Sequence, residues 1–179
     1  FWIVAWDLEQ PQLQHNLPHP CAHFVVERGR SQIVGVMRRR FTRELRGRGM
    51  GFGIALRAGI LPLFTGRPAW HDTGHMRPLD AVFERQASER LEGEILASRD
   101  DHERVFVAER FLRANLPPLQ PEALRAATIV ESIENHRALT RVEAIAEREG
   151  IVVRSLQRLF RRWLGVTPKD VDQRYRIHQ

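Results

Sequence analysis

The chain has 179 residues, 42% of them apolar, and a net charge of +6 at neutral pH. This length is enough for one domain or two small ones, and no run approaches the ~20 continuous apolar residues of a membrane-spanning helix. A single cysteine, Cys21, excludes an internal disulfide and a cysteine-rich zinc site, while the basic surplus favours a polyanionic partner.

Short apolar runs separated by glycines predict strands in the first sixty residues. The runs cover 1–8, which we expect to break at Pro11, and then 23–27, 32–37, 41–45 and 52–57, with turns at Gly29, Gly35, Gly47, Gly49 and Gly51. Several short strands of this kind favour a sandwich or small barrel. We therefore predict a β-rich domain over residues 1–78.

Beyond residue 79 the apolar residues change to helical spacing. Two groups show it, the first being Val82, Phe83, Leu91, Ile95 and Leu96 and the second Val105, Ala108, Phe111 and Leu112. The Pro-Pro-Leu-Gln-Pro segment 117–121 is the expected boundary, so residues 79–120 form a helical segment that packs on or follows the β-rich domain. A further helix should begin at Pro121, with an inward stripe of Leu124, Ala127, Val130 and Ile133.

The residues from Thr140 onward predict two short helices joined at a glycine. Thr140 and Glu143 have the spacing of a capping box, and Gly150 stands where the first helix should end. The second helix should run to about residue 164 with an apolar face of Val153, Leu156, Leu159, Phe160 and Trp163. Gly165 then ends it, and Pro168 begins a third helix. The predicted fold class is thus α+β, with an all-α helix-turn-helix unit over residues 121–179.

The exposed face of that second helix carries side chains that can contact DNA. They are Arg154, Ser155, Gln157, Arg158, Arg161 and Arg162, with Lys169 beyond them. Arginine can form two hydrogen bonds to guanine and glutamine can do so to adenine, whereas the remaining groups suit phosphates. We expect Arg154, Gln157 and Arg158, near the start of the helix, to read bases, and Arg161 and Arg162 to face the backbone. The alternative is a solvated amphipathic helix.

The stretch 156–162 (Leu-Gln-Arg-Leu-Phe-Arg-Arg), followed by Gly-Val-Thr-Pro-Lys at 165–169 and Arg-Tyr-Arg-Ile at 174–177, resembles the first helix-turn-helix of AraC/XylS-type transcriptional regulators. The resemblance covers about 40 residues and implies double-stranded DNA as the partner. Two departures from the family pattern stand out. Val152 replaces the usual serine-like cap, and the chain stops at Gln179 inside the connecting helix, so we expect a second unit to be missing and this unit alone to bind DNA weakly.

The N-terminal part resembles, more loosely, the sensor domain of one AraC branch. The shared residues are Leu17-Pro18, Gly35, Phe41, the 47–49 Gly-Arg-Gly, Phe52, Arg57, Gly59 and the stretch 63–69. This resemblance implies a cupin-like fold that senses a small-molecule effector or mediates homodimerisation. Aromatic residues of the domain (Trp2, Trp6, Phe24, Phe52, Phe64 and Trp70) either line a pocket or fill the core.

Other candidate sites receive less support from the sequence. His15, His19 and His23 recur every four residues, as do His71 and His75, but Pro18, Pro20 and Gly74 argue against helices there. We expect no metal site, no cofactor and no catalytic role for Cys21. The arginines at 38–40, 43, 46 and 48 either extend a DNA contact or form a solvated face, with the solvated face favoured.

The leading hypothesis is a cytoplasmic, sequence-specific DNA-binding regulator with no membrane partner. One alternative is a small-molecule-binding protein whose C-terminal helices are only structural. Another is a metal- or cysteine-dependent enzyme.

Overall fold

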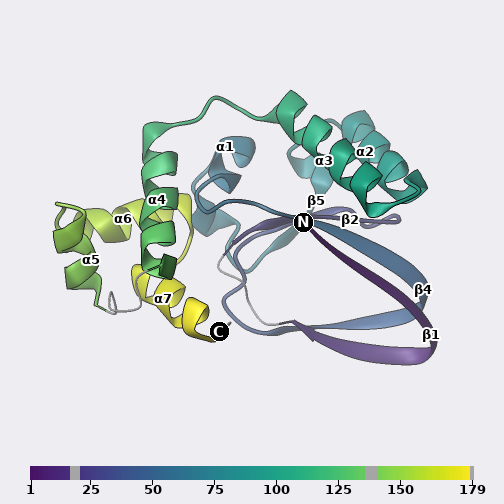
Figure 1. Cartoon of the computed structure of the whole chain (residues 1–179), viewed down its shortest axis with the longest axis horizontal. Coiled ribbons are helices and arrows are strands. Elements are labelled where there is room, and N and C mark those ends of the chain that lie inside the picture. The colour runs from purple at the N-terminus through teal and green to yellow at the C-terminus, as the bar shows by residue number, and fades with distance from the viewer. Residues whose placement is uncertain (17–20, 136–140, 178–179) are drawn as a thin grey trace.

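A computed structural model describes residues 1–16, 21–135 and 141–177, and shows a five-stranded antiparallel sheet followed by helices (Figure 1). The strands are β1 (Trp2–Asn16), β2 (His23–Glu27), β3 (Gln32–Val34), β4 (Phe41–Ala55) and β5 (Met76–Pro78), in the sheet order β1-β4-β2-β3-β5. The helices are α1 (Leu61–Thr65), α2 (Arg85–Ala97), α3 (Asp101–Asn115), α4 (Pro121–Asn135), α5 (Val142–Arg148), α6 (Val153–Trp163) and α7 (Pro168–Ile177), with short 3-10 helices η1 (Ala69–His71) and η2 (Leu79–Ala81). The predicted α+β class is confirmed.

The two longest strands, β1 and β4, correct the strand prediction. β1 continues through Pro11 and absorbs it in a register shift between Leu8 and Gln12. β4 is a single strand where the glycines had predicted turns. The reason lies across the sheet, because Trp2 pairs with Gly53 and Trp6 with Gly49, and a Cβ at either glycine would lie within 2.3 Å of the facing indole ring. These glycines therefore make room for tryptophan rings.

The other strands and the sheet as a whole also differ in part from expectation. β2 has the predicted bounds of 23–27, whereas β3 ends at Val34, three residues before the predicted end at 37. The described strands form one sheet, in which β1 and β5 are the edges. In Figure 1, β1 and β4 run side by side to a bend at the right of the picture and then turn back, and most side chains of β1 are exposed.

The hydrophobic core lies where β2 and the inner end of β4 meet the helices. Phe24 and Phe52 are fully buried, so these two aromatic residues belong to the core. Phe24, Phe64 and Phe83 contact one another edge to face, with ring centroids 5.3–5.7 Å apart, and Phe83 contacts Phe111 of α3. These contacts fix the α2–α3 pair against the sheet. Within the described residues, no helix combines the length and apolar character needed to cross a membrane.

The proline-rich segment at 117–121 lies between α3 and α4, and α4 begins at Pro121 as predicted. The buried face of α4 includes Ala123 and Ala126 rather than Leu124, which is half-buried. The predicted domain boundaries at residues 78 and 120 stay predictions. The buried residues on both sides of them belong to one continuous hydrophobic cluster.

The short helices α5, α6 and α7 lie within the predicted ranges. Gly150, with φ 62°, follows α5, and Val152 precedes α6 without a side-chain cap. The predicted cap Thr140 lies outside the described residues, and Arg141, which precedes α5, makes no side-chain capping bond. A reciprocal cap is found instead before α7, where the Thr167 N–H donates to Asp170 Oδ2 (2.9 Å) and the Asp170 N–H donates to Thr167 Oγ1 (3.1 Å).

The end of α6 is anchored in the β-rich half of the chain. Trp163 and Leu164 are buried beside Cys21, Ala58 and Ala69. The Thr73 hydroxyl donates to the Gly165 carbonyl at 2.9 Å, and Arg57, two residues after β4, makes a bidentate contact with Glu131 of α4 at 2.8 and 3.1 Å. The position of α6 is therefore fixed by contacts with the β-rich half of the chain as well as by contacts with the neighbouring helices.

Gly165 is the residue on which this anchoring depends most. Its φ of 75° is in the left-handed region, and a Cβ there would lie 2.0 Å from Thr73 Oγ1 and 2.8 Å from the Ala69 carbonyl oxygen. We predict that Gly165→Ala lowers the free energy of unfolding by about 2–4 kcal/mol, because the left-handed backbone and the backbone contact each carry a cost. Urea denaturation followed by circular dichroism measures this change.

Gly93→Ala provides the matched control. Gly93 lies inside α2, and a Cβ there would meet nothing within 4 Å. Alanine should therefore stabilise the helix by about 0.5–1 kcal/mol. Equal stability of Gly165→Ala and the unmodified chain would show that the turn after α6 is not tightly packed.

Candidate nucleic-acid interface

The exposed face of α6 is basic along its whole length. Arg154, Gln157, Arg158, Arg161 and Arg162 are exposed, and Leu156, Phe160 and Trp163 occupy the opposite, buried side. At about 100° per residue, the exposed set spans one continuous arc of the helix. Of the other predicted contact residues, Ser155 is half-buried at the edge of this arc, and Lys169 is exposed in the first turn of α7.

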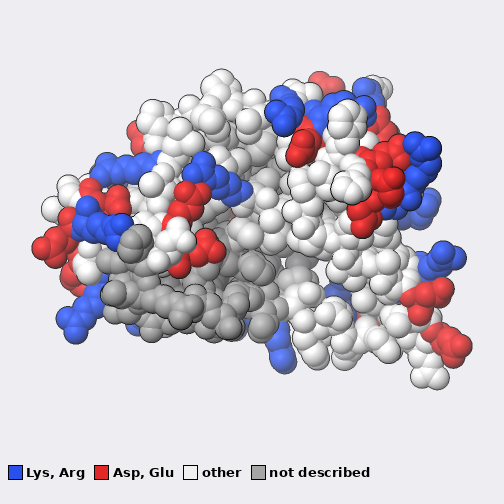
Figure 2. Space-filling model, viewed as in Figure 1, with Lys and Arg blue, Asp and Glu red and all other residues white. Residues whose placement is uncertain are grey.

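Carboxylates are absent from the sequence around this face. No Asp or Glu occurs between residues 151 and 169, which hold four arginines and one lysine. Within the described part of the chain, none of the α6 arginines forms an ion pair, whereas Arg57, Arg67 and Arg77 each contact a carboxylate. The α6 guanidinium groups are thus available to an external anion. Figure 2 shows, on the face it displays, that basic and acidic side chains are intermixed over α2 and α3.

The start of α6 adds hydrogen-bond donors to the same surface. Val152 is 70% exposed and has no polar side-chain atom with which to cap the helix. The first N–H groups of a helix lack intrahelical acceptors and carry the positive end of its dipole. This end of α6, next to Arg154, therefore suits contact with a phosphate or with solvent.

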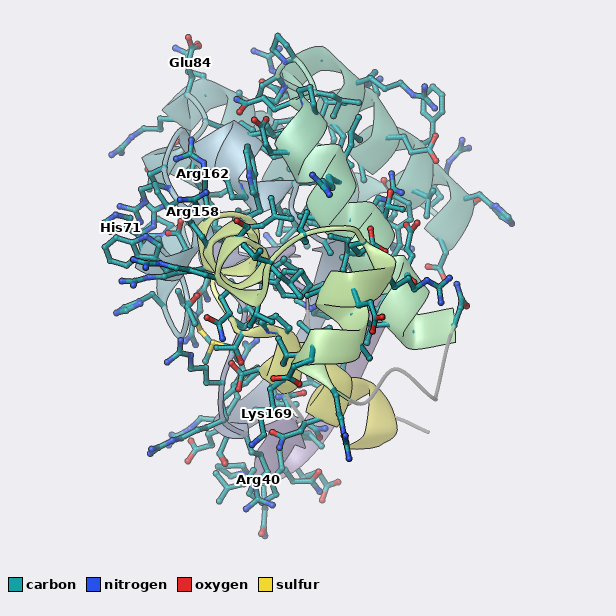
Figure 3. The ribbon with its side chains drawn as sticks, turned by 90° about the vertical axis from the view of Figure 1, so that its left-hand side faces the viewer. Arg40, His71, Glu84, Arg158, Arg162 and Lys169 are labelled. Atoms are coloured by element: carbon teal, nitrogen blue, oxygen red, sulfur yellow. The ribbon has the colours of Figure 1, made fainter. Side chains whose placement is uncertain are left out.

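A groove of about 720 Å³ runs beside α6 and joins it to the β-rich half. Arg158, Arg161 and Arg162 line it together with Pro68 and Trp70, and Glu122 of α4 is the one acidic residue in its described lining. The Arg161 guanidinium lies 5.2 Å from the centre of the Trp70 ring, and Trp70 stacks on His71 with ring centres 3.5 Å apart. Figure 3 shows Arg158, Arg162 and His71 on the same side of α6. The sequence offered no local signal for the Trp70 contact.

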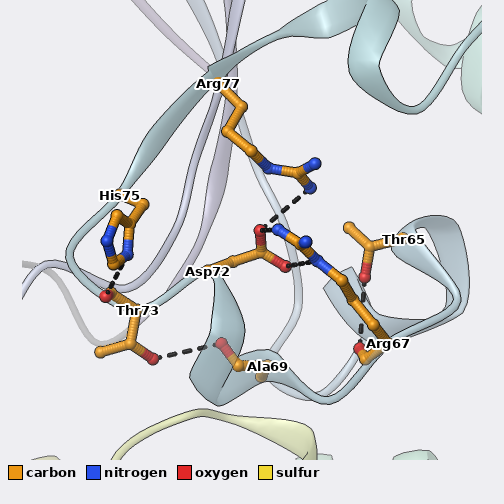
Figure 4. Close-up of polar contacts among 7 residues, drawn as sticks. All are labelled: Thr65, Arg67, Ala69, Asp72, Thr73, His75 and Arg77. Carbon is orange, nitrogen blue, oxygen red and sulfur yellow. Dashed lines mark hydrogen bonds and ion pairs between the residues drawn. The ribbon is translucent and has the colours of Figure 1, made fainter.

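The loop that carries Trp70 is held by a buried carboxylate. Asp72 is only 2% exposed and contacts two arginines, Arg67 and Arg77, with Arg77 Nη2 at 2.9 Å from Oδ1 (Figure 4). The hydrogen bond to Asp72 raises the pKa of Arg67. The next residue, Thr73, then bonds the Ala69 and Gly165 carbonyls at 3.2 and 2.9 Å. Asp72 thereby fixes the segment that holds both Trp70 and the end of α6.

The described histidines with four-residue spacing do not form one cluster, and each makes contacts of its own. His15 lies 2.9 Å from the Thr42 hydroxyl, His75 lies 2.9 Å from the Thr73 carbonyl, and His19 falls outside the described residues. His23 accepts from Trp2 Nε1 at Nδ1 (3.3 Å), which places its own proton on Nε2, 3.5 Å from Cys21 Sγ. Within the described ranges, no group of three His, Cys, Asp or Glu residues has the geometry of a metal site.

A family model described as "Domain of unknown function (DUF6597)" matches residues 1–76, which cover the chain from β1 to the first residue of β5. No curated protein and no solved structure matches the chain.

The burial of Cys21 predicts that its thiol reacts slowly with alkylating reagents. Burial, opposed by a backbone hydrogen bond and reinforced by Glu134, raises the pKa of its thiol from 9.0 to about 11. The thiolate is the reactive form, so at pH 8 the folded chain should react with iodoacetamide about a hundredfold more slowly than the unfolded chain. The rate should rise with pH up to about 11. Mass spectrometry of timed samples measures it, and equal folded and unfolded rates at pH 8 would contradict this account of Cys21.

Proposed function

We propose that this chain is a sequence-specific DNA-binding transcriptional regulator of the AraC type, with α5 and α6 as its helix-turn-helix. The observation that carries the proposal is the acid-free arc on α6, whose exposed arginines lack ion-pair partners among the described residues. A surface of this kind binds the phosphate backbone and can hydrogen-bond to base edges in the major groove. The proposal places the protein in the cytoplasm and assigns it no catalytic role, cofactor or membrane contact.

The two halves of α6 have different surroundings, which supports a division of roles. Arg154, Gln157 and Arg158 belong to the first half, where α6 begins beyond the Gly150 turn. Arg161 and Arg162 belong to the last turn, where Arg161 lies over Trp70 of the β-rich half. Because the first turns of a recognition helix enter the groove, we assign base reading to the first half and backbone contact to the second.

The β-rich half of the chain is proposed to regulate DNA binding. More specifically, we assign it as a cupin-like sensor domain. A groove of about 810 Å³ between the β2–β3 turn, β5 and α2 is the candidate site for a small-molecule effector. Arg77, which contacts Asp72, lines this groove. The edge strand β1, with exposed Trp2, Val4 and Leu13, is the candidate surface for homodimerisation.

A second candidate function is a small-molecule-binding protein whose C-terminal helices serve only to complete the core. The burial of Trp163 and Leu164 against the β-rich half favours it. The exposed arginines of α6 have no role under this alternative, because a purely structural helix needs only its buried face. We therefore place it second.

Arg158→Ala tests the leading proposal. A mixed-sequence duplex library is first selected with the unmodified chain at low salt, and binding to the selected duplex is then followed by fluorescence anisotropy. Loss of a bidentate contact to guanine should cost about 1–3 kcal/mol of binding free energy and relax base preference at one position.

Arg90→Ala is the control for that experiment. Arg90 is an exposed arginine of α2 that forms no ion pair within the described part of the chain, so this variant removes the same charge from a different surface. Its affinity and base preference should match those of the unmodified chain. Failure of the unmodified chain to bind any duplex at low salt, or equal losses in both variants, would refute the proposal.

A further inference from the structure

A hollow of about 450 Å³ lies between the loop that joins β3 to β4 and the turn that joins α6 to α7. Arg38 of the loop and Arg161 of α6 line it together with Trp70 and Thr167. The two arginines come from opposite halves of the sequence. They meet here because Arg38 Nη2 donates to the Gly165 carbonyl at 3.4 Å and Arg161 lies over Trp70.

The hollow contains two cations and no acidic lining residue. Neither Arg38 nor Arg161 forms an ion pair with a carboxylate in the described residues, although arginines elsewhere in the sheet half, such as Arg43 and Arg67, do. Two guanidinium groups that face one hollow repel each other unless an anion lies between them. Their position therefore favours an anion from outside the chain.

The β3–β4 loop extends this positive surface beyond the hollow. Arg38, Arg39 and Arg40 are all exposed, and no Asp or Glu occurs anywhere between residues 28 and 43. Lys169, in the first turn of α7, adds a further exposed cation just after the α6–α7 turn. In Figure 3, Lys169 and Arg40 lie below Arg158 and Arg162.

The position of Arg161 along α6 identifies the anion. Arg161 lies seven residues after Arg154, which is about 10 Å along the axis of an α-helix. The major groove is about 12 Å wide, so a helix whose first turns read bases brings its last turn close to a flanking phosphate. Arg38, which shares the hollow with Arg161, then faces the same backbone.

We propose that the β3–β4 loop is a second DNA-binding element, in which Arg38 and Arg161 hold one backbone phosphate and Arg39 and Arg40 contact the phosphates next to it. This inference rests on the proposed function, because it takes duplex DNA as the partner of α6. It adds that the β-rich half binds DNA directly. The turn at Gly165, bonded by both Arg38 and Thr73, sets the spacing between the two elements.

The experiment compares two variants that lose the same charge. One carries Arg38→Gln, Arg39→Gln and Arg40→Gln, and the other carries Arg90→Gln, Arg99→Gln and Arg113→Gln. The control arginines are also exposed, but they lie on α2, on the α2–α3 turn and on α3, and none of them lines the candidate effector groove. Arg99 and Arg113 each contact a carboxylate at 3.5 Å, and Arg90 forms no ion pair in the described residues. Affinity for the selected duplex is measured by anisotropy over a range of salt concentrations.

Each phosphate contact contributes about 0.9 to the slope of log K against log salt. We expect the slope of the loop variant to fall in magnitude by about 2, because the phosphates contacted by Arg39 and Arg40 are lost while Arg161 still holds the phosphate it shares with Arg38. Base preference should not change, and the slope of the control should stay that of the unmodified chain. Arg38→Gln alone should weaken binding with little change in slope, because the shared phosphate stays neutralised by Arg161. Thermal melting of each variant confirms that the fold is retained.

Equal slopes for the loop variant and the control, with DNA binding intact, would overturn this inference and leave the proposed function standing. A second outcome would also overturn the inference. If the two salt slopes are equal but the loop variant no longer binds inorganic phosphate in the absence of DNA, the hollow is a site for a free anion. Absence of DNA binding by the unmodified chain would overturn both proposals.

Discussion

The close backbone contact at Gly165 determines how the two halves of this protein are joined. Only a residue without a side chain can adopt the left-handed turn there and still lie against Ala69 and Thr73. The Thr73 bond to the Gly165 carbonyl holds the end of α6, and Trp163 and Leu164 are buried just before it. As a result α6 is fixed relative to the sheet, with its arginine face outward. Asp72 supports this arrangement from within, because its contacts with Arg67 and Arg77 hold the segment that contains Thr73.

The charge distribution follows from the same arrangement. Several arginines that join elements of the fold are neutralised by carboxylates, as Arg57 after β4 is by Glu131 of α4. Those on α6 and on the β3–β4 loop lack such partners within the described residues, and the anchoring at Gly165 brings these two groups together. Exposed arginines without ion pairs also occur elsewhere in the described residues, as Arg90 does on α2. On α6 and the β3–β4 loop, however, they form two adjoining groups whose sequence segments contain no Asp or Glu.

Local sequence patterns predicted those features that depend on neighbouring residues. The bounds of β2, the start of α4 at Pro121, the turns at Gly150 and Gly165 and the exposed arc of α6 all follow from periodicity and from glycine or proline positions. The single strand β4 could not be predicted in this way, since Gly49 and Gly53 serve tryptophan rings more than 40 residues earlier in the chain. The positions of Trp70 and Arg38 beside α6 could not be predicted from local patterns either. The Arg38–Gly165 contact, for example, joins residues 127 positions apart in the sequence. The Thr167–Asp170 cap, by contrast, is a local pattern that the sequence does contain.

The most direct test of the central claim, that the outer face of α6 lies against DNA, is photo-cross-linking from that face. Gln157→Cys and, as the control on α2, Arg90→Cys are each labelled with a benzophenone maleimide, while Cys21 stays unlabelled because burial keeps its thiol protonated. The labelled proteins are irradiated with the selected duplex at low salt. We predict a strong protein–DNA cross-link from position 157 and a weak one from position 90. Equal yields, or no cross-link from position 157 while the duplex is bound, would contradict the assignment of α6 as the DNA-contacting helix.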